Sequence, residues 1–171
     1  MRAYAPFFEW FDKGRKELGV VEELIISLNS GGQREFWGPQ LFRPDPPDCI
    51  CFNSAGERVA IEVVEAVCER AARLNAQGQL VFRMWRSGEF RSHIAALLDE
   101  KDQKTYHGGP YAEIITCVFT DEPAVTSDYV AAELQHVFGP FKQLTGGFVL
   151  RSYDPGAQSY PVLPLKVADD A

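Results

Sequence analysis

The stretch DCICFNSAGERVAIEVVE, residues 48–65, decides the fold of this chain. Two runs rich in apolar side chains, 49–53 and 58–65, flank the turn-forming residues Asn53-Ser54-Ala55-Gly56. Such runs, separated by a short segment that contains glycine, are typical of a β-hairpin. A hairpin at this place brings the carboxylates of Asp48 and Glu62 together from two different strands.

Glu62 lies in the middle of an apolar run, and burying its carboxylate without a partner costs several kcal/mol. A divalent cation or a basic side chain is the natural reason to keep two carboxylates there. Carboxylate oxygens suit Mg²⁺ or Mn²⁺, so Asp48 and Glu62 are the predicted metal ligands. Side chains alternate along a strand, so Glu65 lies on the other face unless a bulge intervenes. For Glu65 we favour a solvated position over an accessory role at the site.

The segment GEFRSHIAALLDEKDQKT, residues 88–105, predicts a helix with Ser87 as its N-cap. Its apolar stripe follows the i, i+3, i+4, i+7 pattern and consists of Ile94, Leu97, Leu98 and Lys101. Lys104 lies on the same side, and Tyr106 follows the helix. Two interpretations of Lys101 stay open: its ammonium group extends to water, or it reaches a nearby acidic site. Tyr106 either packs at the helix end or helps to position a ligand.

The remaining chain predicts alternating helices and strands. Helices are expected over 6–18, 67–76 and 127–138, strands over 80–85, 111–120, 147–152 and 162–167, and either a helix or a strand over 20–28. Residues 29–47, rich in Gly and Pro, predict a long loop. This order is typical of an α/β fold with a central mixed sheet flanked by helices. The helical crossover from the hairpin to 111–120 predicts a parallel strand pair.

The length of 171 residues suits a single domain with one hydrophobic core. Within this domain, 1–171, we expect N-terminal helices over 6–28, a core over 44–152 and a tail strand over 162–167. No run approaches the roughly 18 apolar residues of a membrane span, and the N-terminus does not follow a signal-peptide pattern. These features predict a cytoplasmic protein with no membrane partner.

The net charge of −7 argues against broad, sequence-independent binding of nucleic acid. Such binding needs Lys and Arg to neutralise phosphates. The charge is uneven, however, because residues 66–105 carry seven basic and five acidic side chains. A local basic surface is therefore compatible with the acidic whole.

The order Pro47-Asp48, thirteen intervening residues and Glu62-Val63-Val64 resembles the motif of the PD-(D/E)XK nuclease superfamily. The segments PPDCICFNSAGERVAIEVVE, IAALLDEKDQKTY and YAEIITCVF look most like an uncharacterised bacterial branch of that group. The resemblance covers residues 44–120. It implies a restriction-endonuclease-like fold and hydrolysis of phosphodiester bonds that depends on Mg²⁺ or Mn²⁺. In this pattern Asp48 and Glu62 would be the two motif acids.

The lysine of that motif falls on Val64 in this chain. The resemblance implies that the basic residue has moved to a helix, where Lys101, or with less support Lys104, would take its place. Glu65, Lys104 and Tyr106 are the accessory candidates. A helix glutamate near the N-terminus often joins such sites, and Glu9 and Glu23 are candidates that no motif separates.

Three functions stay open from the sequence. The first is a metal-dependent nuclease acting on DNA or RNA, with Asp48, Glu62 and Lys101 as its catalytic residues. The second is a catalytically inactive nuclease-fold protein that binds or regulates, which the missing motif lysine and the acidic charge favour. In the third the two acids pair with arginines, and the candidates are Arg43, Arg58 and Arg83. A homodimer is a further candidate assembly.

Overall fold

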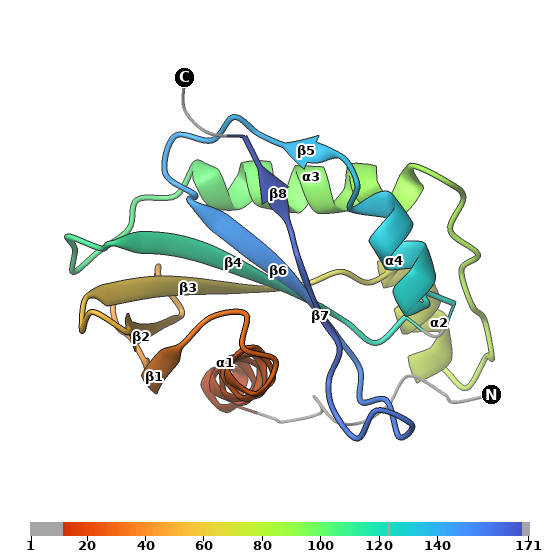
Figure 1. Ribbon diagram of the computed structural model, residues 1–171. Helices are drawn as coiled ribbons and strands as arrows, with labels where there is room; N and C mark the ends of the chain where they lie inside the picture. The colour runs from red at the N-terminus through yellow and green to blue at the C-terminus, as the bar shows by residue number, and fades with distance from the viewer. Residues whose placement is uncertain (1–11, 123, 169–171) are drawn as a thin grey trace.

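The computed structural model describes residues 12–122 and 124–168 and has an α/β architecture (Figure 1). Its elements are α1 (Lys13–Ser30), β1 (Phe36–Leu41), β2 (Cys49–Asn53), β3 (Arg58–Glu65), α2 (Glu69–Ala76), α3 (Glu89–Asp102), β4 (Glu113–Thr120), α4 (Ser127–Glu133), β5 (Val137–Phe138), β6 (Gly146–Arg151), β7 (Val162–Pro164) and β8 (Lys166–Val167). A six-stranded sheet has the order β1-β2-β3-β4-β6-β7, and β5 pairs with β8. The predicted mixed sheet flanked by helices is confirmed.

The predicted hairpin forms the antiparallel pair β2 and β3, in which Cys49 lies opposite Ile61. Its turn places Gly56 at a φ of 77°, a conformation that glycine adopts without steric cost. β4 then joins β3 in parallel, with Thr116 opposite Glu62, so the crossover expectation is also confirmed. β6 continues the parallel part, and β1 and β7 are antiparallel strands at the two edges.

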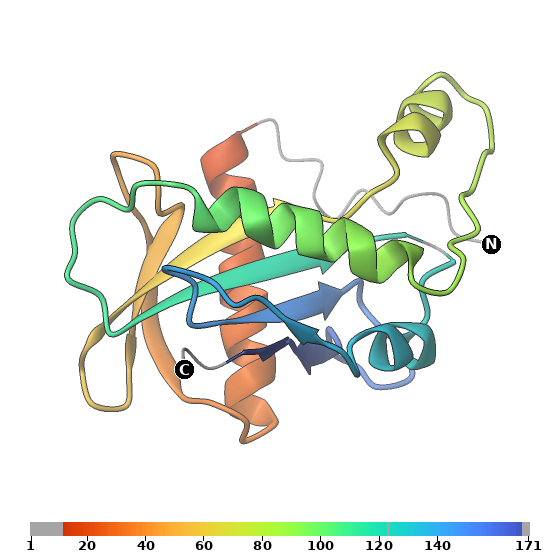
Figure 2. The same cartoon turned by 90° about the horizontal axis from the view of Figure 1, so that it is seen from above.

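Helices cover both faces of the central sheet (Figures 1 and 2). α1 packs against one face, and α3 and α4 lie on the other. Alternate residues of β3 serve the two layers, because successive side chains of a strand point to opposite faces. Ile61 and Val63 join the core under α1, whereas Val64 packs against the core under α3. The face of β3 that carries Glu62 is therefore the α3 face.

The N-terminal part forms one long helix where the sequence predicted two elements. α1 begins after Asp12, whose side chain accepts a hydrogen bond from the backbone N–H of Arg15. The open question over residues 20–28 is decided in favour of a helix. Residues 6–11 lie outside the described residues, so the expected start at residue 6 is not described.

The loop expected over 29–47 contains a strand, β1, and this expectation was wrong. Asn29, near the end of α1, accepts a hydrogen bond from the Phe36 backbone N–H and donates one to the Phe36 carbonyl oxygen, at 3.0 and 2.9 Å. The Phe36 ring is 1 % exposed. A side chain of α1 seven residues earlier thus orders the start of β1, and the Gly- and Pro-rich composition did not indicate this contact.

α3 is shorter than the predicted helix over 88–105. It begins after Gly88, which has a φ of 82°, so Ser87 is not the N-cap. It ends at Asp102, whose carboxylate accepts hydrogen bonds from three backbone N–H groups of residues 142–144. Burial raises the pKa of Asp102, but these three hydrogen bonds outweigh it and lower the pKa. A partner 40 residues away in the chain therefore sets the helix end.

Three further boundaries differ from the predictions. Residues 80–85 form no strand, and the helix expected over 127–138 ends at Glu133. Residues 137–138 instead form β5, which pairs with β8. The single strand expected over 162–167 is divided at Leu165 into β7 and β8, which belong to different sheets. No helix in the described ranges is long and apolar enough to cross a membrane.

Candidate active site

Asp48 and Glu62 meet where β2 begins beside the middle of β3. The backbone N–H of Asp48 donates to Glu62 Oε1 at 3.2 Å, and the N–H of Val63 donates to Asp48 Oδ2 at 2.8 Å. The two acids are only 2 % and 0 % exposed. The β2–β3 hairpin therefore brings together the pair of acids that the sequence singled out.

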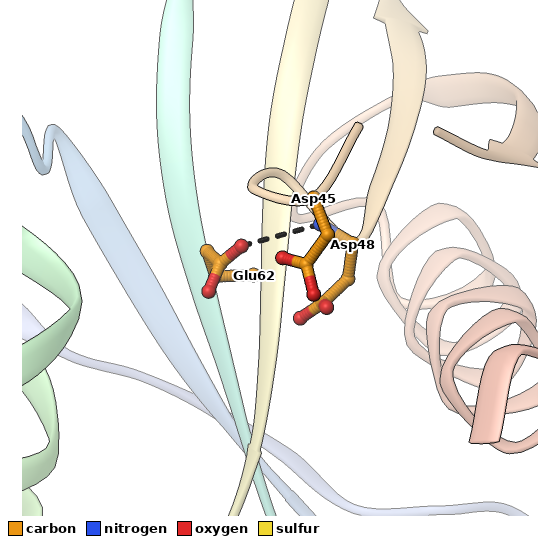
Figure 3. A group of neighbouring side chains, drawn as sticks. All are labelled: Asp45, Asp48 and Glu62. Carbon is orange, nitrogen blue, oxygen red and sulfur yellow. Dashed lines mark hydrogen bonds between the residues drawn. The ribbon is translucent and has the colours of Figure 1, made fainter. Parts of the chain in front are cut away.

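A third acid, Asp45, joins them from the loop that precedes β2 (Figure 3). One carboxylate oxygen from each of Asp45, Asp48 and Glu62 lies within 4.8 Å of the other two. Asp45 is exposed, whereas the other two are buried. The sequence analysis did not identify Asp45, although the segment Asp45-Pro-Pro-Asp48 places a second acid close to Asp48 in the chain. Two acids separated by two prolines lie on a short, conformationally restricted segment.

Lys101 reaches this acidic group from α3. Its Nζ lies 2.7 Å from Glu62 Oε2, and Lys104 Nζ lies 3.1 Å from the same oxygen. The Lys101 side chain is 10 % exposed and that of Lys104 is 30 % exposed. Of the two interpretations of Lys101, contact with the acidic site is the one that the structure has. Glu62 is thus a buried carboxylate held by two ammonium groups.

Tyr106 and Glu65, the other accessory candidates, have different surroundings. The Tyr106 hydroxyl donates to the backbone carbonyl of Lys101 at 3.1 Å, and burial raises the pKa of this phenol. Tyr106 therefore braces the end of α3. Glu65 pairs with Lys16 of α1 at 3.0 Å. The register of β3 with β4 is continuous from Val59 to Glu65, so no bulge turns Glu65 toward Glu62.

A glutamate of α1 does approach the site, but it is neither of the two predicted. Glu17 is 5 % exposed and has Lys13 at 3.1 Å and Arg43 at 4.0 Å. Its Oε2 atom is buried without a hydrogen-bond partner. Of the predicted glutamates, Glu9 lies outside the described residues, and Glu23 lines a separate cavity of about 680 Å³.

The pattern that found Lys101 would also have found Glu17. Glu17 begins an i, i+3, i+4, i+7 stripe whose other members are the buried Val20, Val21 and Leu24. A charged residue in register with such a stripe is carried toward the core, and needs a partner there.

Burial and neighbouring charges shift the pKa values of two groups at the site. Burial raises the pKa of Asp48, and the negative charges of Glu17 and Asp45 raise it further. The hydrogen bond from the Val63 N–H and the charge of Lys101 act in the opposite direction and do not offset these effects. Burial lowers the pKa of Lys104, but the charge and hydrogen bonds around it outweigh burial, so its pKa is raised.

One buried polar atom beside Glu62 has no partner. Thr116 lies opposite Glu62 in the parallel pair of β3 and β4, on the same face of the sheet. It is 0 % exposed, and its Oγ1 atom makes no hydrogen bond. An unsatisfied buried hydroxyl costs about 1–3 kcal/mol. The α3 face around Glu62 therefore retains unused hydrogen-bonding capacity.

The site acids are held by lysines and backbone N–H groups, not by arginines. Arg43 and Arg83 pair with other glutamates, and Arg58 donates to a backbone carbonyl. Among residues 12–122 and 124–168, no arginine pairs with Asp48 or Glu62, so the third alternative is not the arrangement that the structure has.

The site consequently has two parts: a group of three acids open at Asp45, and two lysines that contact the buried Glu62. Its chemistry must be inferred from this geometry. No family model, curated protein or solved structure matches the chain.

Proposed function

We propose that this protein is a metal-dependent nuclease that hydrolyses phosphodiester bonds of DNA or RNA. One observation carries the proposal: carboxylate oxygens of Asp45, Asp48 and Glu62 lie within 4.8 Å of one another, and Lys101 Nζ lies 2.7 Å from Glu62. An acid pair on adjoining strands with a lysine beside it is the arrangement that the PD-(D/E)XK resemblance implies. We extend the proposal to a restriction-endonuclease-like fold, which the hairpin and the parallel crossover to β4 support.

The residues present fit a hard divalent cation. Mg²⁺ and Mn²⁺ prefer oxygen ligands, and Asp48, Glu62 and Asp45 would supply them. A carboxylate offers about four lone-pair positions, and Glu62 accepts three hydrogen bonds, which leaves capacity for a further interaction. When bound, Mg²⁺ or Mn²⁺ supplies a Lewis acid that polarises a phosphate oxygen and acidifies water.

The chain's own groups hold the carboxylates in position and supply positive charge. The Val63 N–H holds Asp48 Oδ2 in place, and Lys101 holds Glu62 Oε2 in place. Such preorganised charges stabilise a transition state because they need no rearrangement during the reaction. The raised pKa of Lys104 keeps its ammonium group charged at neutral pH. These two lysines stand where a positive charge can offset the charge that develops on the phosphate, in place of the motif lysine replaced by Val64.

A catalytically inactive binding or regulatory protein is the second candidate, and one observation favours it. Both lysines contact the same oxygen of Glu62, at 2.7 and 3.1 Å. Two ammonium groups already neutralise this carboxylate, which weakens its attraction for a cation. In this alternative the acids and lysines are a buried structural network.

Calorimetric titration of Mn²⁺ separates the two candidates. We expect the wild type to bind Mn²⁺ and Asp48→Asn/Glu62→Gln to lose this binding. Glu65→Gln is the matched control, because it removes a β3 carboxylate from the other face and should leave binding unchanged.

Cleavage of single- and double-stranded DNA and RNA with Mg²⁺ or Mn²⁺ completes the test. Activity that disappears in Asp48→Asn and in Lys101→Ala supports the nuclease. A wild type that neither binds Mn²⁺ nor cleaves any of these substrates would select the inactive protein instead.

A further inference from the structure

The segment between β3 and α3, residues 67–88, differs in charge from the rest of the chain, and we call it the α2 arm. It contains four arginines and one glutamate, whereas the whole chain has a net charge of −7. Figure 2 shows α2 and the following segment projecting beyond the sheet and α3. The arm is therefore a basic projection on an acidic protein.

Three of the arm's four arginines form no ion pair with any residue in 12–122 or 124–168. Arg70 and Arg73 are three residues apart on α2, both are exposed, and neither makes an ion pair or a side-chain hydrogen bond with any described residue. Arg86 is also exposed, and its backbone N–H donates to the Glu89 carboxylate at 3.0 Å. Arg83 differs, because it pairs with Glu89 and stacks 4.2 Å from the Trp85 ring. Arg70 and Arg73 share one side of a helix and present two positive charges to an external anion.

Apolar side chains accompany these charges. Leu80 is 75 % exposed and Met84 is 78 % exposed, more than any other large hydrophobic side chain in the described ranges. Proteins that bind nucleic acid combine arginines on the phosphates with apolar side chains against sugars and bases. The arm offers both kinds of contact.

The arm projects to the same side of the molecule as the loop that carries Asp45. In Figure 2 the loop before β2, the N-terminal end of α1 and α2 all project to the upper side. The loop carries Asp45. Lys13, the first residue of α1, is 75 % exposed at its side chain and pairs with Glu17 and Asp45 at 3.1 and 3.6 Å. A polyanion crossing this side could contact the loop, the start of α1 and the arm.

Chain length limits the distance between the site and the arm. Arg70 follows Glu62 by eight positions, and an extended chain spans at most about 3.3–3.6 Å per residue, so their Cα atoms are at most about 26–29 Å apart. At about 3.4 Å per step of a nucleic-acid strand, this corresponds to at most about eight steps. A strand that extends about eight nucleotides beyond the cleaved bond is therefore long enough to reach the arm.

We propose that the α2 arm holds the phosphate backbone of the substrate, through Arg70 and Arg73, within about eight nucleotides of the cleaved bond. This inference rests on the proposed nuclease function. It makes the protein a nuclease that prefers long strands and binds them through a local basic element, although the chain as a whole is acidic.

Fluorescence anisotropy with labelled 6- and 24-nucleotide strands, single and double, tests the arm in EDTA, where no metal-dependent cleavage occurs. We expect the wild type to bind the 24-mers more tightly than the 6-mers, and Arg70→Ala/Arg73→Ala to lose this difference. The slope of log affinity against log salt is negative, and each lost phosphate contact reduces its magnitude by about 0.7 for single strands and about 0.9 for duplexes. The double variant should therefore reduce this magnitude by about 1.4 to 1.8.

Lys142→Ala/Lys166→Ala is the matched control. It removes two positive charges from exposed residues outside the arm and should keep the wild-type slope. Both double variants should unfold at the temperature of the wild type, which would show that these exposed substitutions leave the fold intact.

Three results would overturn the proposal: no strand binding by the wild type, equal slopes for Arg70→Ala/Arg73→Ala and the control, or an arm variant that changes only the oligomeric state. The last result would make the arm a protein interface. Strand binding that depends on the arm, without cleavage, would instead refute only the proposed catalysis. Cleavage that depends on Asp48, with no effect of the arm variant on binding, would refute only the arm.

Discussion

The two glutamates of β3 each form an ion pair with lysine, but on opposite faces of the sheet. Glu62 is 0 % exposed and contacts Lys101 and Lys104 of the α3 side. Glu65 has a side chain that is 36 % exposed and contacts Lys16 of α1. The residue types and the strand are the same, and only the surroundings differ. Burial therefore decides how much the loss of a glutamate–lysine ion pair costs in stability.

The largest effect should follow from removing both lysines from Glu62. Breaking a buried ion pair leaves an uncompensated charge, so Lys101→Met/Lys104→Met should lower the free energy of unfolding by about 3–5 kcal/mol. Urea unfolding followed by circular dichroism measures this loss.

Replacing the carboxylate as well should restore stability. Glu62→Met/Lys101→Met/Lys104→Met has no buried charge at this place, and apolar replacement of a buried ion pair is often neutral or stabilising. If Lys101→Met/Lys104→Met lowers the free energy of unfolding by less than about 1 kcal/mol, the ion pairs of Glu62 behave like the surface pair of Glu65 and Lys16.

A second effect should appear in the pH dependence of Asp48. Burial raises the pKa of Asp48 above that of the unfolded chain, so the folded state binds this proton more tightly. The resulting stabilisation is complete below about pH 3.9, the ordinary pKa of Asp, and is lost as the pH rises through the raised pKa. Asp48→Asn cannot titrate, so its stability relative to the wild type should increase from pH 3.5 to pH 7. A difference that stays constant across this range in urea unfolding would contradict the raised pKa.

The smallest effect should come from the exposed pair of Lys16 and Glu65. Partly exposed ion pairs contribute about 0–1 kcal/mol and are screened by salt. A double-mutant cycle with Lys16→Met and Glu65→Gln should give a coupling energy in this range at low salt, and less in 1 M NaCl. A coupling that equals that of Glu62 with Lys101 would remove the distinction between the two faces.

Local patterns predicted the parts of the site that lie on regular elements. The hairpin followed from two apolar runs around a glycine turn, and it located Asp48 and Glu62. The apolar helix stripe placed Lys101 on the buried side of its helix, but left open whether its ammonium group extends to water or reaches the acidic site. In each case a periodic pattern states which face a side chain occupies.

The same reasoning failed where contacts between separate elements order the chain. Residues 29–47 were expected to form a loop, yet Phe36 is held by Asn29 and opens β1. Asp45 lies in an irregular segment, where no period predicts the direction of a side chain. Glu17 did lie in a readable stripe, but the sequence offered no means of knowing that α1 would pass beside Asp48.

The sequence by itself determined the hairpin, the parallel crossover and the place of Lys101 on the apolar stripe of its helix, because these depend on the period of apolar side chains along a strand or helix. Only the tertiary structure decided that both Lys101 and Lys104 would bind one oxygen of Glu62, and that Asp45 and Glu17 would approach Asp48. Those contacts depend on how a helix and a loop pack against the sheet. Packing is set by the whole core together, and no local segment specifies it.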